Sequence, residues 1–417
     1  MLREYINLPR PVHILCLGMF INRAGSFVLV FLTIYISEKL GHGEAFAAQC
    51  MGVFGFGSIF ASLIGGQLAD QIGRKTVMVS ALFGGAILLG LLSTASSKPA
   101  IALTILGYAL IAETFRPACS AMLGDFTTPA QRPIAFGLFY ISINLGFACG
   151  PPIGGILADI SYRLLFFGDA ATMAVFGVII LLMLPESKSL LTDENDNRPV
   201  EIPAAKAIRQ ILADGPFLVF CVATLLIAVV FMQSVSTLPL HIKRAGYDNS
   251  QFGALMAING LLIFIVQLPL THYLERFNAM SNIIVGGVLI AVGFGLYFFP
   301  VSLIGLIAAV LVWTLGEIMQ APFKQTVVTN LAPLPLRARY LGLFSMCYSL
   351  ALTIGAPTGG FVLERFGARA LWRGCFVVAA FGVVAYAMAY RSITLRTNQT
   401  APEPMDEPTA ATASNCP

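Results

Sequence analysis

The stretch Gly137–Gly155, with the sequence GLFYISINLGFACGPPIGG, decides the fold of this chain. It is almost entirely apolar, yet it contains five glycines and two adjacent prolines. Gly146, Gly150 and Gly154 are four residues apart, so on a helix they share one face, against which a neighbouring backbone can pack. The two prolines remove backbone donors and bend the helix. Inside a membrane a partner helix or a cavity must then satisfy the freed carbonyls.

The composition of the whole chain is that of a membrane protein. The chain has 417 residues, of which 57% are hydrophobic and only 11% are charged, with a mean hydropathy of +0.81. This charge content is too low to cover the surface of a soluble protein. Apolar runs long enough to span a bilayer recur from about residue 12 to about residue 391, and we predict twelve transmembrane helices. The first run is too long for a cleavable signal peptide, and no small-residue cleavage site follows it.

The distribution of charge predicts the orientation and the domains. The net charge of +4 says little, but more of the 25 Lys and Arg residues fall on one side of the predicted spans. By the positive-inside rule that side is cytoplasmic and holds both termini of a multi-pass protein of the cytoplasmic (inner) membrane. We expect a six-helix bundle over 1–184, a cytoplasmic linker over 185–214, a second six-helix bundle over 215–391, and a disordered cytoplasmic tail over 392–417.

The two predicted bundles repeat one another in sequence with an offset of 205 residues. Asp70 corresponds to Glu275, and Gly150 corresponds to Gly355. An offset that covers six helices returns the chain to the same side of the membrane, so the repeats are parallel. The predicted fold class is therefore an all-α membrane protein with twelve transmembrane helices in two parallel-repeat six-helix bundles.

The loop between the second and third spans, GQLADQIGRK, carries a carboxylate at a cytoplasmic helix end. There Asp70 can pair with Arg74 or with a helix N-terminus, and Gly73 allows a tight turn. An ordinary basic loop would explain Arg74 and the lysine but not the spaced glycines and aspartate. The loop resembles motif A of the major facilitator superfamily, a gating motif formed here by Gly66, Asp70, Gly73, Arg74 and Lys75. The second-half copy of this loop keeps only the acid Glu275, so any contact that holds the helix ends together there should be weaker.

The opening stretch also resembles a motif of this superfamily. Its spacing is similar to that of motif C, the fifth-helix signature of antiporters, with the residues Gly137, Gly146, Gly150, Pro151, Gly154 and Gly155. A plain helix-packing face is the alternative, but it does not explain Gly137, which lies on the opposite side of the helix. Arg116 resembles the arginine of motif B, although Ser120 stands where that motif has a glycine. The resemblance covers nearly the whole chain and is to the twelve-helix, proton-coupled drug:H⁺ antiporter group. It implies alternating access about a cavity lined by spans 1, 4, 7 and 10.

Five ionisable residues lie within apolar spans: Arg23, Glu113, Arg116, Glu317 and Lys324. A charge at the bilayer centre costs about 2.5–3.5 kcal/mol on insertion scales, so these side chains should face the bundle interior. Glu113 and Arg116 are three residues apart and should pair. Three cations then face two acids, and we expect Lys324 to extend toward the cytoplasmic surface.

We predict that Glu317 is the main proton-coupling carboxylate and that Glu113 belongs to a structural or substrate-orienting pair. Glu317 has no cation one turn away, and burial without a cation favours the protonated form of a carboxylate. In the alternative, Glu317 pairs with Arg23 or Arg116 across the bundle and is a structural strut. The predicted substrate cavity is formed by Asn22, Arg23, Glu113, Arg116, Tyr140, Asn144, Gln233, Trp313, Glu317, Gln320 and Lys324.

The sequence favours export of a small organic molecule driven by protons. An importer of a peptide, sugar or siderophore on the same fold, and a receptor without transport activity, are the alternatives. No enzyme, cofactor or metal site is expected, because the four histidines are scattered and the eight cysteines lack metal-binding spacing. The expected partners are the substrate, protons and the lipid bilayer, with no nucleic acid, and we expect a monomer.

Overall fold

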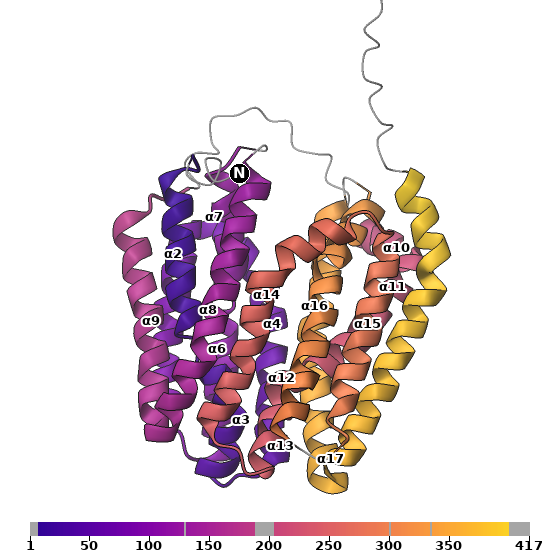
Figure 1. Cartoon of the computed structure of the whole chain (residues 1–417). Helices are drawn as coiled ribbons and strands as arrows, with labels where there is room; N and C mark the ends of the chain where they lie inside the picture. The colour runs from indigo at the N-terminus through magenta and orange to yellow at the C-terminus, as the bar shows by residue number, and fades with distance from the viewer. Residues whose placement is uncertain (1–6, 129–130, 188–203, 300–301, 334–335, 400–417) are drawn as a thin grey trace, which may run out of the picture.

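The computed structural model describes residues 7–128, 131–187, 204–299, 302–333 and 336–399. These residues form helices joined by turns and short loops, with no strand in the described ranges (Figure 1). The first half contains α2 (Arg10–Ala24), α3 (Val28–Ile34), the π-helical turn η1 (Tyr35–Lys39), α4 (Glu44–Ile72), α5 (Arg74–Leu92), α6 (Lys98–Ala112), α7 (Phe115–Asp125), α8 (Arg132–Ile160) and α9 (Tyr162–Met183). The second half contains α10 (Ala204–Ala213), α11 (Gly215–Phe231), α12 (Gln233–Ser236), α13 (Leu238–Arg244), α14 (Asn249–Leu274), α15 (Ala279–Leu296), α16 (Leu303–Leu331) and α17 (Arg337–Gln399).

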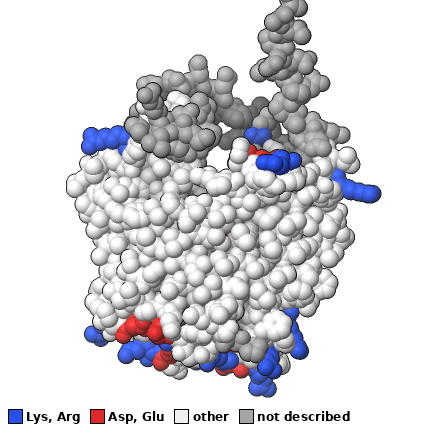
Figure 2. All heavy atoms as spheres, viewed as in Figure 1, with Lys and Arg blue, Asp and Glu red and all other residues white. Residues whose placement is uncertain are grey.

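The described helices provide twelve membrane crossings, as predicted. Eleven helical segments are long and apolar enough to span a bilayer, and the last of them, Arg339–Arg396, has 58 residues. A helix of that length would extend about 87 Å, far more than one bilayer. It turns at Gly367, whose φ of 82° is a left-handed conformation that favours glycine, and so crosses twice. On the face drawn in Figure 2 the charged residues gather at the two ends of the molecule, and the belt between them shows no Lys, Arg, Asp or Glu.

Three of the spans are interrupted near their middle. The first breaks between α2 and α3, the fourth between α6 and α7, and the seventh between α11, α12 and α13. Each interruption releases backbone groups that water cannot reach in a bilayer. These are three of the four spans, 1, 4, 7 and 10, that the sequence resemblance predicts to line a cavity.

The glycine face of α8 packs against the first span, as its spacing predicts. A Cβ added at Gly146 would lie 2.6 Å from the Cβ of Arg23, and one at Gly150 would lie 3.0 Å from the Arg23 carbonyl oxygen. At Gly154 an added Cβ would come within 2.9 Å of the Phe31 ring. A Cβ added at Gly137, on the other side of α8, would meet no atom of the described residues within 4 Å. The three-glycine face is therefore filled by α2 and α3.

The two halves meet along two antiparallel helix pairs, α8 with α14 and α4 with α17. A Cβ added at Gly253 of α14 would lie 2.2 Å from the carbonyl oxygen of Pro151, the residue that bends α8. In the other pair, a Cβ at Gly52 of α4 would lie 2.5 Å from Pro357 of α17. Glycine on one helix thus faces proline on the other in both interfaces.

The predicted disordered tail is wrong in its first residues, because α17 continues to Gln399 instead of ending near residue 391. Ile393 is fully buried, and Arg396 forms an ion pair of 2.8 Å with Asp214, which ties the end of α17 to the start of α11. Residues 400–417 of the predicted tail and 188–203 of the predicted linker lie outside the described residues. The rest of the linker includes the amphipathic helix α10.

The packing of α8 predicts that Gly150→Leu destabilises the protein. Overpacking of a closely packed site costs about 1–3 kcal/mol, which lowers the melting temperature by about 1–3 °C at an unfolding entropy of about 2.1 cal/mol/K per residue. The melting temperature of the purified protein in detergent is the measurement. Gly137→Leu on the same helix is the matched control, since Gly137 faces open space. Equal melting temperatures for the two variants would show that the Gly150 position is not confined.

Candidate functional site

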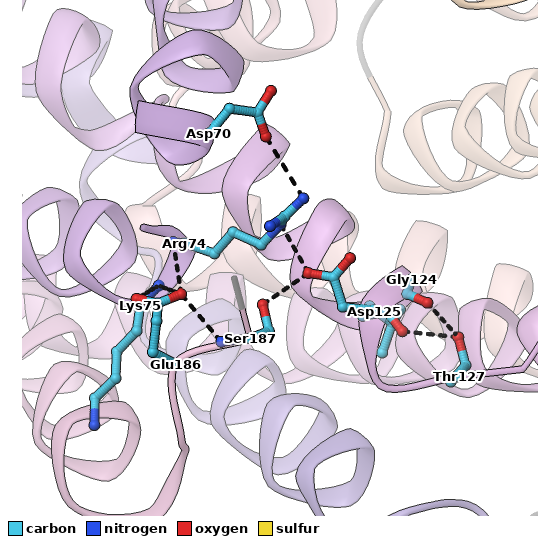
Figure 3. A network of polar contacts seen from close by, with 9 residues as sticks. Asp70, Arg74, Lys75, Gly124, Asp125, Thr127, Glu186 and Ser187 are labelled. Carbon is cyan, nitrogen blue, oxygen red and sulfur yellow. Dashed lines mark hydrogen bonds and ion pairs between the residues drawn. The ribbon is translucent and has the colours of Figure 1, made fainter. Parts of the chain in front are cut away.

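The motif A loop forms a polar network at the end of the molecule that holds the start of α2 and the end of α17 (Figure 3). The buried Arg74 lies 2.8 Å through Nε from a carboxylate oxygen of Asp125 at the end of α7. Its Nη2 lies 3.5 Å from Asp70, whose side chain is 73% exposed. The Ser187 hydroxyl donates a 2.7 Å hydrogen bond to the same Asp125 carboxylate. Arg74 is therefore held mainly by Asp125 and only loosely by Asp70.

Glu186 adds a second contact at the same place by accepting from the N-terminus of α5. Its carboxylate accepts from the backbone N–H of Arg74 at 2.9 Å and of Lys75 at 3.1 Å. These are unpaired N–H groups of a helix start, where negative charge is favourable. Gly73 precedes them with a φ of 100°, and a Cβ there would lie 2.5 Å from the Glu186 carboxylate. The Lys75 ammonium also donates to the Leu184 carbonyl at 2.7 Å.

This network joins the ends of four spans, α4, α5, α7 and α9. The sequence predicted the pairing of Asp70 with Arg74 and the glycine turn, but it missed Asp125, Glu186 and Ser187. Glu275 stands at the position of Asp70 in the second half. Among the ion pairs of the described residues it contacts only its neighbour His272, at 3.3 Å. The offset of 205 puts Asn330 and Arg391 where Asp125 and Glu186 would be, so the second half lacks the acids that hold the network.

In the first half the predicted pair of embedded charges is formed. Arg116 Nε lies 3.0 Å from the Glu113 carboxylate, with side chains 60% and 15% exposed. The pair lies at the break between α6 and α7, and the Arg116 side chain is exposed rather than packed in the core. The Nε of Arg23 is buried and has no hydrogen-bond partner among the described residues.

Asp169 of α9 is an embedded acid that the sequence analysis left out of its count. It is 2% exposed and accepts a 3.0 Å hydrogen bond from the backbone N–H of Val28, the first residue of α3. The predicted surplus of positive charge is therefore wrong, since Asp169 brings the embedded acids level with the cations. The signal was available, because Asp169 interrupts an apolar span in the same way as Glu317 does.

In the second half Glu317 is held by an amide and forms no ion pair within the described chain. Asn259 of α14 donates through Nδ2 to the Glu317 carboxylate at 3.0 Å and to the Thr314 hydroxyl at 3.1 Å. The carboxylate lines a cavity of about 120 Å³ together with Gln320, Lys324 and Tyr348. Neither Arg23 nor Arg116 contacts Glu317 in this structure, so the predicted strut is not present here. The sequence gave no indication of Asn259.

Lys324 does not extend to the surface, so that expectation is wrong. The residue is 3% exposed, and its ammonium lies 5.6 Å from the centre of the Tyr386 ring. The face of an aromatic ring attracts a cation, which stabilises the buried ammonium inside the bundle. The Lys324 side chain thus turns toward α17 and stays inside the bundle.

Three other residues predicted to line the cavity are buried in the second half. Gln233 is 2% exposed and donates to the Gly355 carbonyl at 2.9 Å, which links the broken seventh span to α17. Trp313 is 2% exposed, and its indole N–H donates to the Tyr297 hydroxyl at 3.1 Å. Gln320 is 1% exposed and donates to the carbonyl of Ile283 at 2.9 Å. In this structure Gln233 and Trp313 stabilise the core, whereas Gln320 reaches the small cavity beside Glu317.

The remaining predicted residues lie on α8 and α2. Tyr140 of α8 is exposed. Asn144 donates through Nδ2 to the Tyr140 carbonyl at 2.9 Å, and Asn22 is partly buried.

The motif A network predicts that Arg74→Gln destabilises the protein. Removing one member of a buried ion pair leaves the other charge unpaired and costs about 3–5 kcal/mol. Arg209→Gln on α10, an exposed arginine, is the control. We expect thermal unfolding of the purified protein to shift to lower temperature only for Arg74→Gln. Equal shifts for both variants would contradict the role of Asp125 as the main partner of Arg74.

Comparison with known proteins agrees with this architecture. The chain is 28% identical to a Na(+), Li(+), K(+)/H(+) antiporter of Planococcus maritimus, an alignment that covers 80% of this chain and 85% of the relative. It is 25% identical to the multidrug resistance protein MdtH of Aeromonas hydrophila over 80% and 82% of the two chains. The solved structure of a POT family transporter in complex with a thioalcohol conjugated peptide has the same fold, with a TM-score of 0.79, 16% identity, and coverage of 93% and 97%. Residues 15–356 match the family model of the Major Facilitator Superfamily, and the chain belongs to that superfamily of transporters.

Proposed function

We propose that this chain is a proton-coupled antiporter that exports a small organic molecule across the cytoplasmic membrane by alternating access. In this proposal both termini are cytoplasmic, so the end that carries the motif A network is the inner end. The two bundles, 1–184 and 215–391, move relative to one another, and the bound proton drives the exchange.

The environment of Glu317 is the observation that carries the proposal. Its carboxylate lies inside the bundle, lines a small cavity, and has an amide as its hydrogen-bond partner. A carboxylate without a contacting cation changes its charge more readily than a salt-bridged one, because no ion pair is broken when it binds a proton. Glu113, in contrast, is paired with Arg116 at 3.0 Å. This difference supports Glu317 as the coupling residue and the Glu113–Arg116 pair as a substrate-facing element.

The spacing of the helices supports an inward-facing state. Gly66 of α4, Gly137 of α8 and Gly342 of α17 all lie toward the inner end, and an added Cβ at each would meet nothing within 4 Å. Nearer the opposite end α4 packs closely against α17 at Gly52, and α8 packs closely against Gly253 of α14. In this arrangement the cavity would be reached from the cytoplasm.

The direction of transport rests on motif C and on the names of two relatives, an antiporter and a multidrug resistance protein. The peptide-bound structure shares only the fold, so import of a peptide is the weaker reading. The antiporter relative makes exchange of a monovalent cation for protons a second candidate. Proteoliposomes with a pH-sensitive dye inside separate these cases when organic cations, dipeptides, Na⁺, Li⁺ and K⁺ are added in turn.

Glu317→Gln should abolish substrate-driven proton movement in these proteoliposomes while substrate binding is retained. The amide cannot release a proton, yet it preserves the size of the side chain and a hydrogen bond with Asn259. Binding is measured by the ligand-induced shift in melting temperature. Glu113→Gln is the matched comparison and should weaken binding more than coupling. Proton movement that survives in Glu317→Gln but not in Glu113→Gln would reverse the two roles.

Asp70→Asn should leave the protein folded but slow transport and favour the inward-facing state. Asp70 is largely exposed here, and its contact with Arg74 is long, at 3.5 Å. Its carboxylate is therefore available for a partner that approaches when the inner end closes. Accessibility of a single cysteine in the cavity to a maleimide, added from the cytoplasmic side, is the measurement. Unchanged labelling and unchanged transport would contradict a role for Asp70 in closing the inner end.

A further inference from the structure

At the outer end, a carboxylate of the first half binds the start of a helix in the second half. Asp159, at the end of α8, accepts hydrogen bonds from the backbone N–H of Asn249 at 3.3 Å and of Ser250 at 3.0 Å. It also accepts from the Asn249 side chain at 2.8 Å and from the Ser250 hydroxyl. Asn249 is the first residue of α14. Four donors of one half therefore converge on one carboxylate of the other.

The second half makes the reciprocal contact. Glu364 of α17 accepts a 2.6 Å hydrogen bond from the backbone N–H of Ala45, the second residue of α4. The offset of 205 relates Glu364 to Asp159 and Ala45 to Ser250. The two links are thus equivalent contacts, one made by each half, although the residue types at these positions differ.

The glycines at the outer ends of α8 and α17 make this approach possible. A Cβ added at Gly155 would lie 2.5 Å from the Asn249 carbonyl oxygen, and one at Gly360 would lie 2.2 Å from the Cβ of Ala48. Gly155 and Gly360 are also related by the offset of 205. They lie one turn before Asp159 and Glu364, so close backbone contact brings each carboxylate to the opposing helix start.

We infer that Asp159 and Glu364 are a pair of latches that hold the outer end closed and must both release before the transporter opens outward. The first N–H groups of a helix lack partners within the helix and carry partial positive charge, so a carboxylate binds them well. When the halves separate, each latch loses its donors together. The inference rests on the proposed alternating access and on the proposed orientation, but on neither the substrate nor the proton.

Distance measurements between spin labels on the two halves test the latches. In a cysteine-free background, labels at Thr94 in the first half and Arg369 in the second report the outer end, since both residues are exposed there. Asp159→Ala with Glu364→Ala should raise the population of the longer distance at least about threefold over the parent protein. Each single variant should give an intermediate population. Only variants that elute as folded protein with near-parent melting temperature are compared.

Two further variants keep the test specific. Asp159→Glu with Glu364→Asp exchanges the two acids but keeps both carboxylates, and should preserve the short distance. Glu275→Gln removes an exposed carboxylate at the inner end and should change nothing at the outer labels. An unchanged distance distribution in the folded double alanine variant would overturn the inference, as would an equal shift in Glu275→Gln. Because no substrate or proton gradient is present, neither result bears on proton-coupled export.

Discussion

Backbone groups inside a bilayer must find their partners within the protein, and the polar side chains of this structure follow from that constraint. The first span breaks at residues 25–27, and the carboxylate of Asp169, from the sixth span, accepts from the first N–H after the break. The seventh span breaks at Met232, and Gln233 there bonds to a carbonyl of the eleventh span. Two of the three broken spans are thus joined at their break to a distant helix by a polar contact. These contacts allow irregular backbone beside the cavity without exposing it to lipid.

The two halves share their packing but not their chemistry. Glycine and proline positions at the interfaces recur with the offset of 205, as Gly150 and Gly355 do. The embedded charges do not recur, because Glu317 corresponds to Ala112 and Arg116 corresponds to Ala321. A duplicated scaffold therefore carries different charged groups in its two halves. The asymmetry leaves a salt-bridged acid in one half and an amide-bound acid in the other.

The sequence predicted the features that depend on spacing along one helix and missed those that depend on contacts between helices. The spans, the glycine face of α8 and the Glu113–Arg116 pair follow from periodicity, which a single sequence records. The partner of Glu317 could not be predicted, because Asn259 lies on another helix and looks like any polar residue in a span. The prediction that Trp313 lines the cavity is wrong for the same reason. The rotation of α16 about its axis decides whether this side chain faces a cavity or the core, and one sequence does not record that rotation.

The turns between the second and third helices of each half differ in how they are supported. In the first half the start of α5 depends on Glu186, which comes from another helix of the bundle. In the second half Asn278, at the position of Gly73, caps α15 by accepting from the N–H of Met280 at 2.9 Å, and it donates to the Thr394 hydroxyl of α17 at 3.5 Å. The first turn is therefore braced by a carboxylate, and the second by neutral hydrogen bonds. Separating the helices around these turns would break charged contacts in the first half but only neutral hydrogen bonds in the second.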